Sequence, residues 1–106
     1  NYVVVFKINK ADVNQKEEIN LKEIADKIKQ YPAAKFRVTG YADEQTGTAA
    51  YNEALSKQRA EAVYNVLVNK YNVNPNQLIL SYKGGVADLF DGQPRLSRAT
   101  IVSVSE

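Results

Sequence analysis

The chain has 106 residues, of which 44% are hydrophobic and 25% are charged, so its composition is that of one globular domain and excludes a disordered or fibrous chain. Its 14 Lys and Arg against 12 Asp and Glu leave a formal charge of +2, an excess too small to indicate nucleic-acid binding. The absence of His and Cys excludes imidazole and thiolate catalysis, and also zinc sites with nitrogen or sulfur ligands.

The amino-terminal segment carries the longest apolar run, Tyr2 to Phe6, which is too short to cross a bilayer. Residues 2–8 are β-branched and aromatic, which predicts a strand buried on both faces. Because the chain enters this strand without a Met, we expect residues 1–106 to be one domain taken from a longer protein. Any membrane attachment would then lie in the missing parts.

The first helix is predicted over residues 17–31, after a polar turn at 9–14 and before Pro32, which disfavours helical backbone in the residue ahead of it. Its apolar residues share one helical face, namely Leu21, Ile24, Ala25 and Ile28. Alternating polar and apolar residues over 35–40 predict a second strand.

The second half of the chain contains one long helix, from Ala49 or Ala50 to Tyr71. Its expected inner face comprises Leu55, Ala62, Val63, Val66, Leu67 and Lys70. The remaining predicted elements are a loop at 41–50, a turn at 72–76, a strand at 78–82, a long loop at 83–97 and a strand at 100–104.

The order of these elements is β-α-β-α-β-β. It predicts an α/β (α+β) sandwich in which two main helices cover one face of a small mixed sheet.

A possible binding site lies between the second strand and the long helix. Asp43 follows the strand, and Asn52, Leu55 and Arg59 share one helical face at spacings i, i+3 and i+7. A carboxylate facing a guanidinium can hold a zwitterion, because the carboxylate takes an ammonium and Arg takes a carboxylate. The alternative is an ion pair between Asp43 and Arg59 that fastens the loop to the helix. We expect Asp43 to lie in the loop and Arg59 at the edge of the helix rather than on its apolar stripe.

Three segments resemble one known family. Gly40-Tyr41-Ala42-Asp43, the run Asn52-Glu53-Ala54-Leu55-Ser56-Lys57-Gln58-Arg59-Ala60-Glu61-Ala62-Val63 and the opening Phe6-Lys7-Ile8-Asn9-Lys10-Ala11 are similar to the motifs of the OmpA-like (Pal, MotB-type) peptidoglycan-binding domain. The resemblance covers nearly the whole chain. It implies a periplasmic domain of an outer-membrane-associated protein in a Gram-negative bacterium, which grips the meso-diaminopimelate of the peptidoglycan stem peptide.

The resemblance also implies site residues. By position, Asp43 and Arg59 match the two principal ligand-binding residues, and further matches are Asn9, Ala42 and Asn52. The chain departs from the family pattern at Ala42, where Thr is common, and in a lengthened loop before Asn52. Arg98 matches one arginine of a carboxyl-terminal pair, and either ligand binding or a structural role is open to it.

These observations favour a non-catalytic cell-wall binding domain with no cofactor and no metal. Its partner would be peptidoglycan, with no nucleic acid, and with a membrane only through missing parts of the parent protein. A second hypothesis is a protein–protein adaptor on the same fold, with Asp43 and Arg59 as a brace. A third, a carboxylate-dependent hydrolase, is disfavoured because no second acid is clearly placed beside Asp43.

Overall fold

The computed structural model describes residues 2–6, 11–43, 48–86 and 99–105, with only the backbone described at 43 and 84–86. The strands are β1 (Tyr2–Val5), β2 (Lys35–Asp43), β3 (Leu78–Val86) and β4 (Ala99–Ser105), and the helices are α1 (Gln15–Gln30) and α2 (Ala49–Asn65). A π-helical turn, Val66–Lys70, continues α2, and a 3₁₀ turn, Pro75–Gln77, leads into β3.

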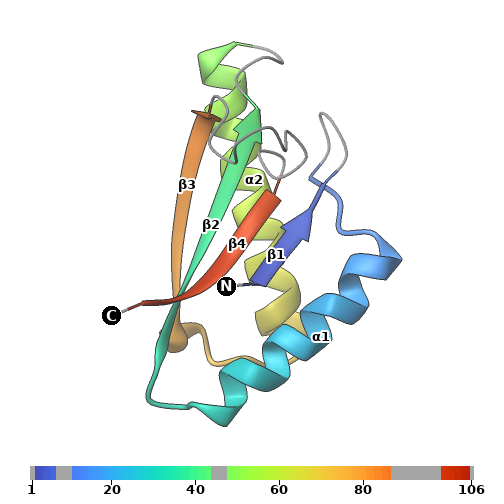
Figure 1. Cartoon of the computed structure of the whole chain (residues 1–106), viewed down its shortest axis with the longest axis vertical. Coiled ribbons are helices and arrows are strands. Elements are labelled where there is room, and N and C mark those ends of the chain that lie inside the picture. Colours follow the sequence, from blue (N-terminus) through green and yellow to red (C-terminus); the bar gives the residue numbers. More distant parts are fainter. Residues whose placement is uncertain (1, 7–10, 44–47, 87–98, 106) are drawn as a thin grey trace.

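The four strands form one mixed sheet in the order β1-β4-β2-β3. Strand β4 is antiparallel to both β1 and β2, whereas β3 is parallel to β2. Strands β1, β2 and β3 therefore run in one direction and β4 runs in the other (Figure 1). As a result, three strands end and the fourth begins at the same end of the sheet.

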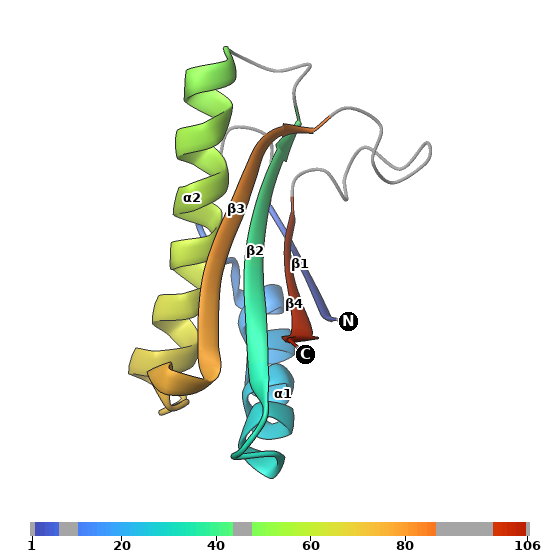
Figure 2. The ribbon, with the colours of Figure 1, turned by 90° about the vertical axis from the view of Figure 1, so that its left-hand side faces the viewer.

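Both helices pack on one face of this sheet. The strand residues of the core, among them Val4, Phe36, Val38 and Val102, belong to the same buried cluster as the apolar residues of α1 and α2. Pairing of Val38 with Val102, and of both Val4 and Gly40 with Thr100, places these residues on the same side. In Figure 2 the sheet is seen nearly edge-on, with α2 along one side of β2 and β3.

At the amino terminus of each helix, a side chain accepts a hydrogen bond from a backbone N–H that has no partner within the helix. The Asn14 side chain accepts a hydrogen bond from the Glu17 N–H at the start of α1, and the Thr48 hydroxyl accepts one from the Tyr51 N–H at the start of α2. Two acidic residues in the first turn of α1 also suit the positive end of the helix dipole.

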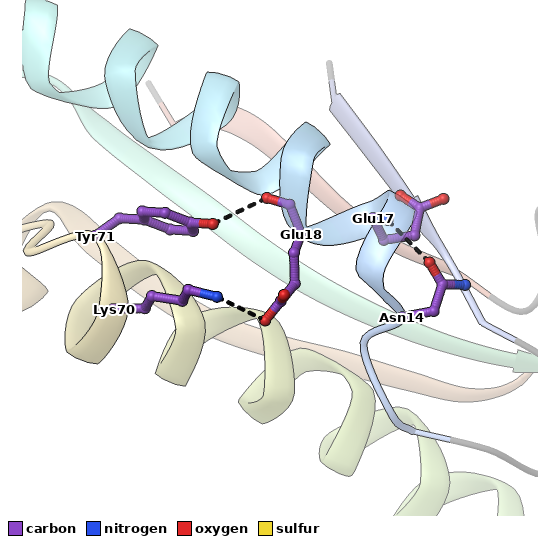
Figure 3. A network of polar contacts seen from close by, with 5 residues as sticks. All are labelled: Asn14, Glu17, Glu18, Lys70 and Tyr71. Atoms are coloured by element: carbon purple, nitrogen blue, oxygen red, sulfur yellow. Dashed lines mark hydrogen bonds and ion pairs between the residues drawn. The ribbon is translucent and has the colours of Figure 1, made fainter.

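The far end of α2 is joined to the start of α1 by a small polar network (Figure 3). Lys70 forms an ion pair with the Glu18 carboxylate at 3.0 Å, and the Tyr71 hydroxyl donates a hydrogen bond to the Glu18 carbonyl at 3.1 Å. These contacts connect residues more than fifty positions apart in the chain. They link the start of α1 to the π-helical turn that follows α2.

The predicted fold class is confirmed, and five local predictions need correction. Residues 41–43 and 83–86 extend β2 and β3 instead of belonging to loops. The first strand is not buried on both faces, because the helices cover only one; Val4 is buried, whereas Val3 and Val5 are partly exposed. Lys70 is exposed and pairs with Glu18, so it does not belong to the inner face. The last turn predicted as α-helix is a π-helical turn.

Within the described ranges, no helix is both long enough and apolar enough to cross a membrane.

Candidate functional site

The candidate site lies where β1, β2 and β3 end and β4 begins. In sheets covered by helices, the carboxyl ends of parallel strands are common places for ligand sites. Phe6, directly after β1, and Ala42, near the end of β2, are both buried there. Asp43 is the last residue of β2 and pairs with Val86 of β3.

Gly40 brings α2 unusually close to β2. A Cβ atom at Gly40 would lie 1.9 Å from the Ser56 carbonyl oxygen and 2.9 Å from the Ala60 nitrogen, and both of these atoms are backbone. Only glycine permits this approach. The contact fixes the height of α2 above the strand at the turn of the helix that carries Arg59.

Arg59 is a charged residue within the protein interior. It is 1% exposed and is the largest of the fully buried side chains among the described residues. Its Nη1 donates a hydrogen bond to the Tyr41 carbonyl oxygen at 2.9 Å, and its guanidinium carbon lies 5.5 Å from the centre of the Phe6 ring. These contacts hold the guanidinium in a low-dielectric environment, where its interactions with an anion are stronger than in water.

Tyr41 lies where the regular pairing of β2 changes. The register with β4 extends to the pair Gly40 and Thr100, and the register with β3 shifts between Tyr41 and Asp43. Bulges of this kind often lie beside functional sites because they redirect side chains. The Tyr41 phenol is partly buried, and this desolvation raises its pKa above the ordinary value.

Two buried polar atoms at this end have no hydrogen-bond partner in the described part of the structure. They are the Asn52 side-chain oxygen on α2 and the Thr100 hydroxyl on β4. Leaving a buried polar atom unpaired costs about 1–3 kcal/mol, so native proteins retain few of them. Together with Arg59, they give this end of the core a polar character.

The structure brings part of the predicted site together. Asn52, Leu55 and Arg59 are all buried on one face of α2, as their spacing predicted, and Ala42 is buried at the end of β2. The expectation that Arg59 lies at the edge of the helix is wrong, because the Tyr41 carbonyl and the Phe6 ring allow it to occupy the inner face.

The side chains of the other predicted site residues are not among those that the structure describes. The Asp43 side chain, Asn9 and Arg98 lie outside the described residues, so the pairing of Asp43 with Arg59 stays a prediction. The backbone of Asp43 is described and ends β2, two residues beyond the carbonyl that Arg59 contacts.

Sequence reasoning missed the contributions of Gly40, Phe6 and the Tyr41 carbonyl. A glycine inside a strand does indicate close backbone approach, so Gly40 was detectable in principle. Phe6 was noticed only as part of a strand motif, and its contact with Arg59 joins residues 53 positions apart that no local spacing connects. A backbone carbonyl has no sequence pattern of its own.

The chain is similar to known proteins in both sequence and fold. The model of the OmpA family matches residues 5–101. Outer membrane protein 40 of Porphyromonas gingivalis is 38% identical over 104 residues, which is 98% of this chain and 27% of that protein. The chain thus spans about a quarter of the length of this curated relative.

Two solved structures have the same architecture. The peptidoglycan-associated lipoprotein from Burkholderia pseudomallei superposes with a TM-score of 0.84 at 26% identity, covering 99% of this chain and 91% of that chain. The carboxyl-terminal domain of Helicobacter pylori MotB gives a TM-score of 0.85 at 25% identity, covering 100% and 85%.

These relatives are structural proteins, which confirms that the chain is a non-enzymatic domain. The match of the family model to nearly the whole chain agrees with the strand-end and helix motifs around Gly40 and Arg59. The chain belongs to the OmpA family.

Proposed function

We propose that this domain binds peptidoglycan non-covalently and anchors the outer membrane to the cell wall from the periplasm. The observation that carries the proposal is Arg59, a guanidinium buried at the strand ends and fixed by the Tyr41 carbonyl, two residues from Asp43. Domains of the OmpA family associate with peptidoglycan, and one structural neighbour is a peptidoglycan-associated lipoprotein.

The proposed ligand group is the meso-diaminopimelate side chain of the stem peptide. Its free end carries an ammonium and a carboxylate on one carbon. Asp43 takes the ammonium and Arg59 takes the carboxylate with two parallel N–H donors, a geometry that Lys cannot supply. The unpaired Asn52 oxygen supports this proposal, because it is a buried acceptor suited to an N–H donor of the ligand.

The remaining assignments follow from the family resemblance for Asn9, Ala42 and Arg98. Leu55 is assigned from its place on the face of α2 that carries Arg59. These residues line the site in this proposal, with Ala42 contributing backbone groups because it lacks the hydroxyl of the more common Thr. The unit that binds is the single domain of residues 1–106, and parts of the parent protein outside it supply attachment to the membrane.

Titration with three stem peptides tests the ligand assignment. We expect the 106-residue chain to bind a stem with meso-diaminopimelate more tightly than a lysine stem by about 10- to 150-fold, since a hydrogen bond to a charged group contributes about 1.5–3 kcal/mol. Amidation of the terminal carboxylate should weaken binding similarly. Equal affinity for all three stems, measured by calorimetry, would exclude the zwitterion mechanism.

A charge-neutralising variant tests the role of Asp43. Asp43→Asn keeps the shape of the side chain and removes its charge, so we expect binding of purified sacculi to fall by about tenfold or more. Asp26→Asn, at an exposed position of α1, makes the same change in net charge and serves as the control. Equal losses for both variants would show that only overall charge matters.

A second candidate function is favoured by the internal contacts of Arg59. A guanidinium bonded to a backbone carbonyl and set over a ring could be a structural brace in a protein–protein adaptor. In that case the unmodified chain would fail to sediment with sacculi that contain diaminopimelate. Binding of sacculi by the chain would exclude the adaptor hypothesis in its simple form.

A further inference from the structure

Arg59 connects two strands that are not neighbours in the sheet. Its hydrogen-bond acceptor, the Tyr41 carbonyl, belongs to β2, and the ring beneath its guanidinium, Phe6, follows β1. Strand β4 lies between β1 and β2 in the sheet, so these two contacts come from strands that do not pair with each other. A hydrogen bond and a ring contact thus reach Arg59 from two separate parts of the sheet.

The contact between Arg59 and Phe6 is sheltered from water. Phe6 is 2% exposed and Arg59 is 1% exposed, and 5.5 Å from the guanidinium carbon to the ring centre is within the range of a cation–π interaction. Desolvation strengthens such a contact. The buried ring lies against the guanidinium and limits its rotation on that side.

We propose that Phe6 is a positioning residue for Arg59, whose aromatic face holds the guanidinium in the orientation that receives the carboxylate of the ligand. This inference rests on the proposed peptidoglycan binding. A group already held in its bound orientation loses less entropy on binding, so the ring increases affinity without touching the ligand. A residue that only filled the core at this position would not need a π face.

Graded fluorination of the Phe6 ring distinguishes a role in positioning Arg59 from a role in filling the core. Fluorine atoms withdraw charge from the ring face and weaken its attraction for a cation, while the size and apolar character of the ring change little. We expect affinity for the diaminopimelate stem to fall stepwise with each fluorine added at Phe6, by about 3- to 30-fold for the most substituted ring.

Phe36 provides a matched control. It is also buried, at 3% exposure, and belongs to the apolar core on β2. The same fluorinated rings at Phe36 should leave affinity for the stem unchanged. Phe6→Leu, which keeps an apolar side chain and removes the ring, should weaken binding at least as much as the most fluorinated ring.

A second measurement follows Arg59 in the free protein. NMR of the Arg59 Nε–H group reports its side-chain order, which should decrease with fluorination at Phe6 and stay constant with fluorination at Phe36. Unchanged order, or unchanged stem affinity across the Phe6 series in a chain that binds the stem, would overturn the inference. If the unmodified chain bound no stem, the proposed function would fail, and the NMR series would still decide whether Phe6 positions Arg59.

Discussion

Arg59 illustrates how a charged residue comes to occupy a core position. It lies four residues after Leu55 and four before Val63, both of which are buried, so helical periodicity alone assigns it to the inner face of α2. Because Arg59 is charged, the sequence predicted that it lies at the edge of the helix instead. The partners that make its burial tolerable come from β2 and from the residue after β1. Both are distant in the chain, so no local sequence pattern indicates them.

Gly40 is the residue at which the sequence most directly determines the site. We expect Gly40→Ala to destabilise the domain by about 3 kcal/mol or more, because the added methyl group would collide with backbone atoms of Ser56 and Ala60 that cannot rotate away. Urea denaturation measures this change in the free energy of unfolding.

The same substitution should weaken stem binding in whatever fraction stays folded. Lifting α2 from β2 lengthens the path from Arg59 to the Tyr41 carbonyl. Serine at position 40 should behave like alanine. A Gly40→Ala protein with unchanged stability would show that the helix can move without cost, and that the close approach does not fix the site.

Among the elements, the helices were more predictable than the strand ends. The apolar face of α1 was predicted residue by residue, because four positions with helical spacing need no distant information. The sequence predicted that β2 and β3 end earlier in the chain than they do in the structure. The two strands support each other in a parallel pair up to Asp43 and Val86, and this pairing overrides the turn-forming tendency of Gly84 and Gly85.

The carboxyl end of α1 depends on a side chain from a different element. Gln77, in the 3₁₀ turn before β3, directs its amide nitrogen toward the carbonyl oxygens of Ile28, Tyr31 and Ala34, at distances of 2.9–3.3 Å. The amide thus adds a hydrogen-bond donor to carbonyls at the end of α1 and in the turn that follows it. It ties the turn between α1 and β2 to the start of β3.

Replacing Gln77 should therefore loosen one end of the domain. We expect Gln77→Leu to lower the free energy of unfolding by about 1–3 kcal/mol, since buried carbonyls lose a donor. Gln58→Leu, at an exposed position of α2, is the control and should change stability little. Equal unfolding midpoints for the two variants would contradict a capping role for Gln77.

The stability of the domain as a whole should fall at alkaline pH because of two groups, Lys70 in the polar network between the helices and Tyr41 on β2. The hydrogen bond to Glu18 raises the pKa of Lys70 above its ordinary value of 10.5, and burial raises the pKa of Tyr41 above 10.0. Both groups hold their protons more tightly when folded. Their contribution is complete below the ordinary pKa values and is lost as pH rises through the folded ones.

We therefore expect the thermal midpoint to fall as pH rises above about 10. Lys70→Met should remove part of this dependence, whereas Lys57→Met, at an exposed position of α2, should leave it as it is. Added salt should weaken the Lys70 contribution, because the ion pair with Glu18 is exposed. If the thermal midpoint depended on pH in the same way in Lys70→Met and Lys57→Met, groups other than Lys70 would account for the loss of stability at alkaline pH.

The antiparallel pairing of β1 with β4 also determines how the domain responds to mechanical load. The register Tyr2–Val102 to Val5–Ala99 places the amino end of β1 away from the candidate site and its carboxyl end beside it. A pull between the amino end of β1 and a wall-bound site would act along the axis of β1. Such a force would shear all the β1–β4 hydrogen bonds together instead of breaking them one after another. Strand β1, the shortest of the sheet, would thus be pulled in the direction in which its pairing resists most.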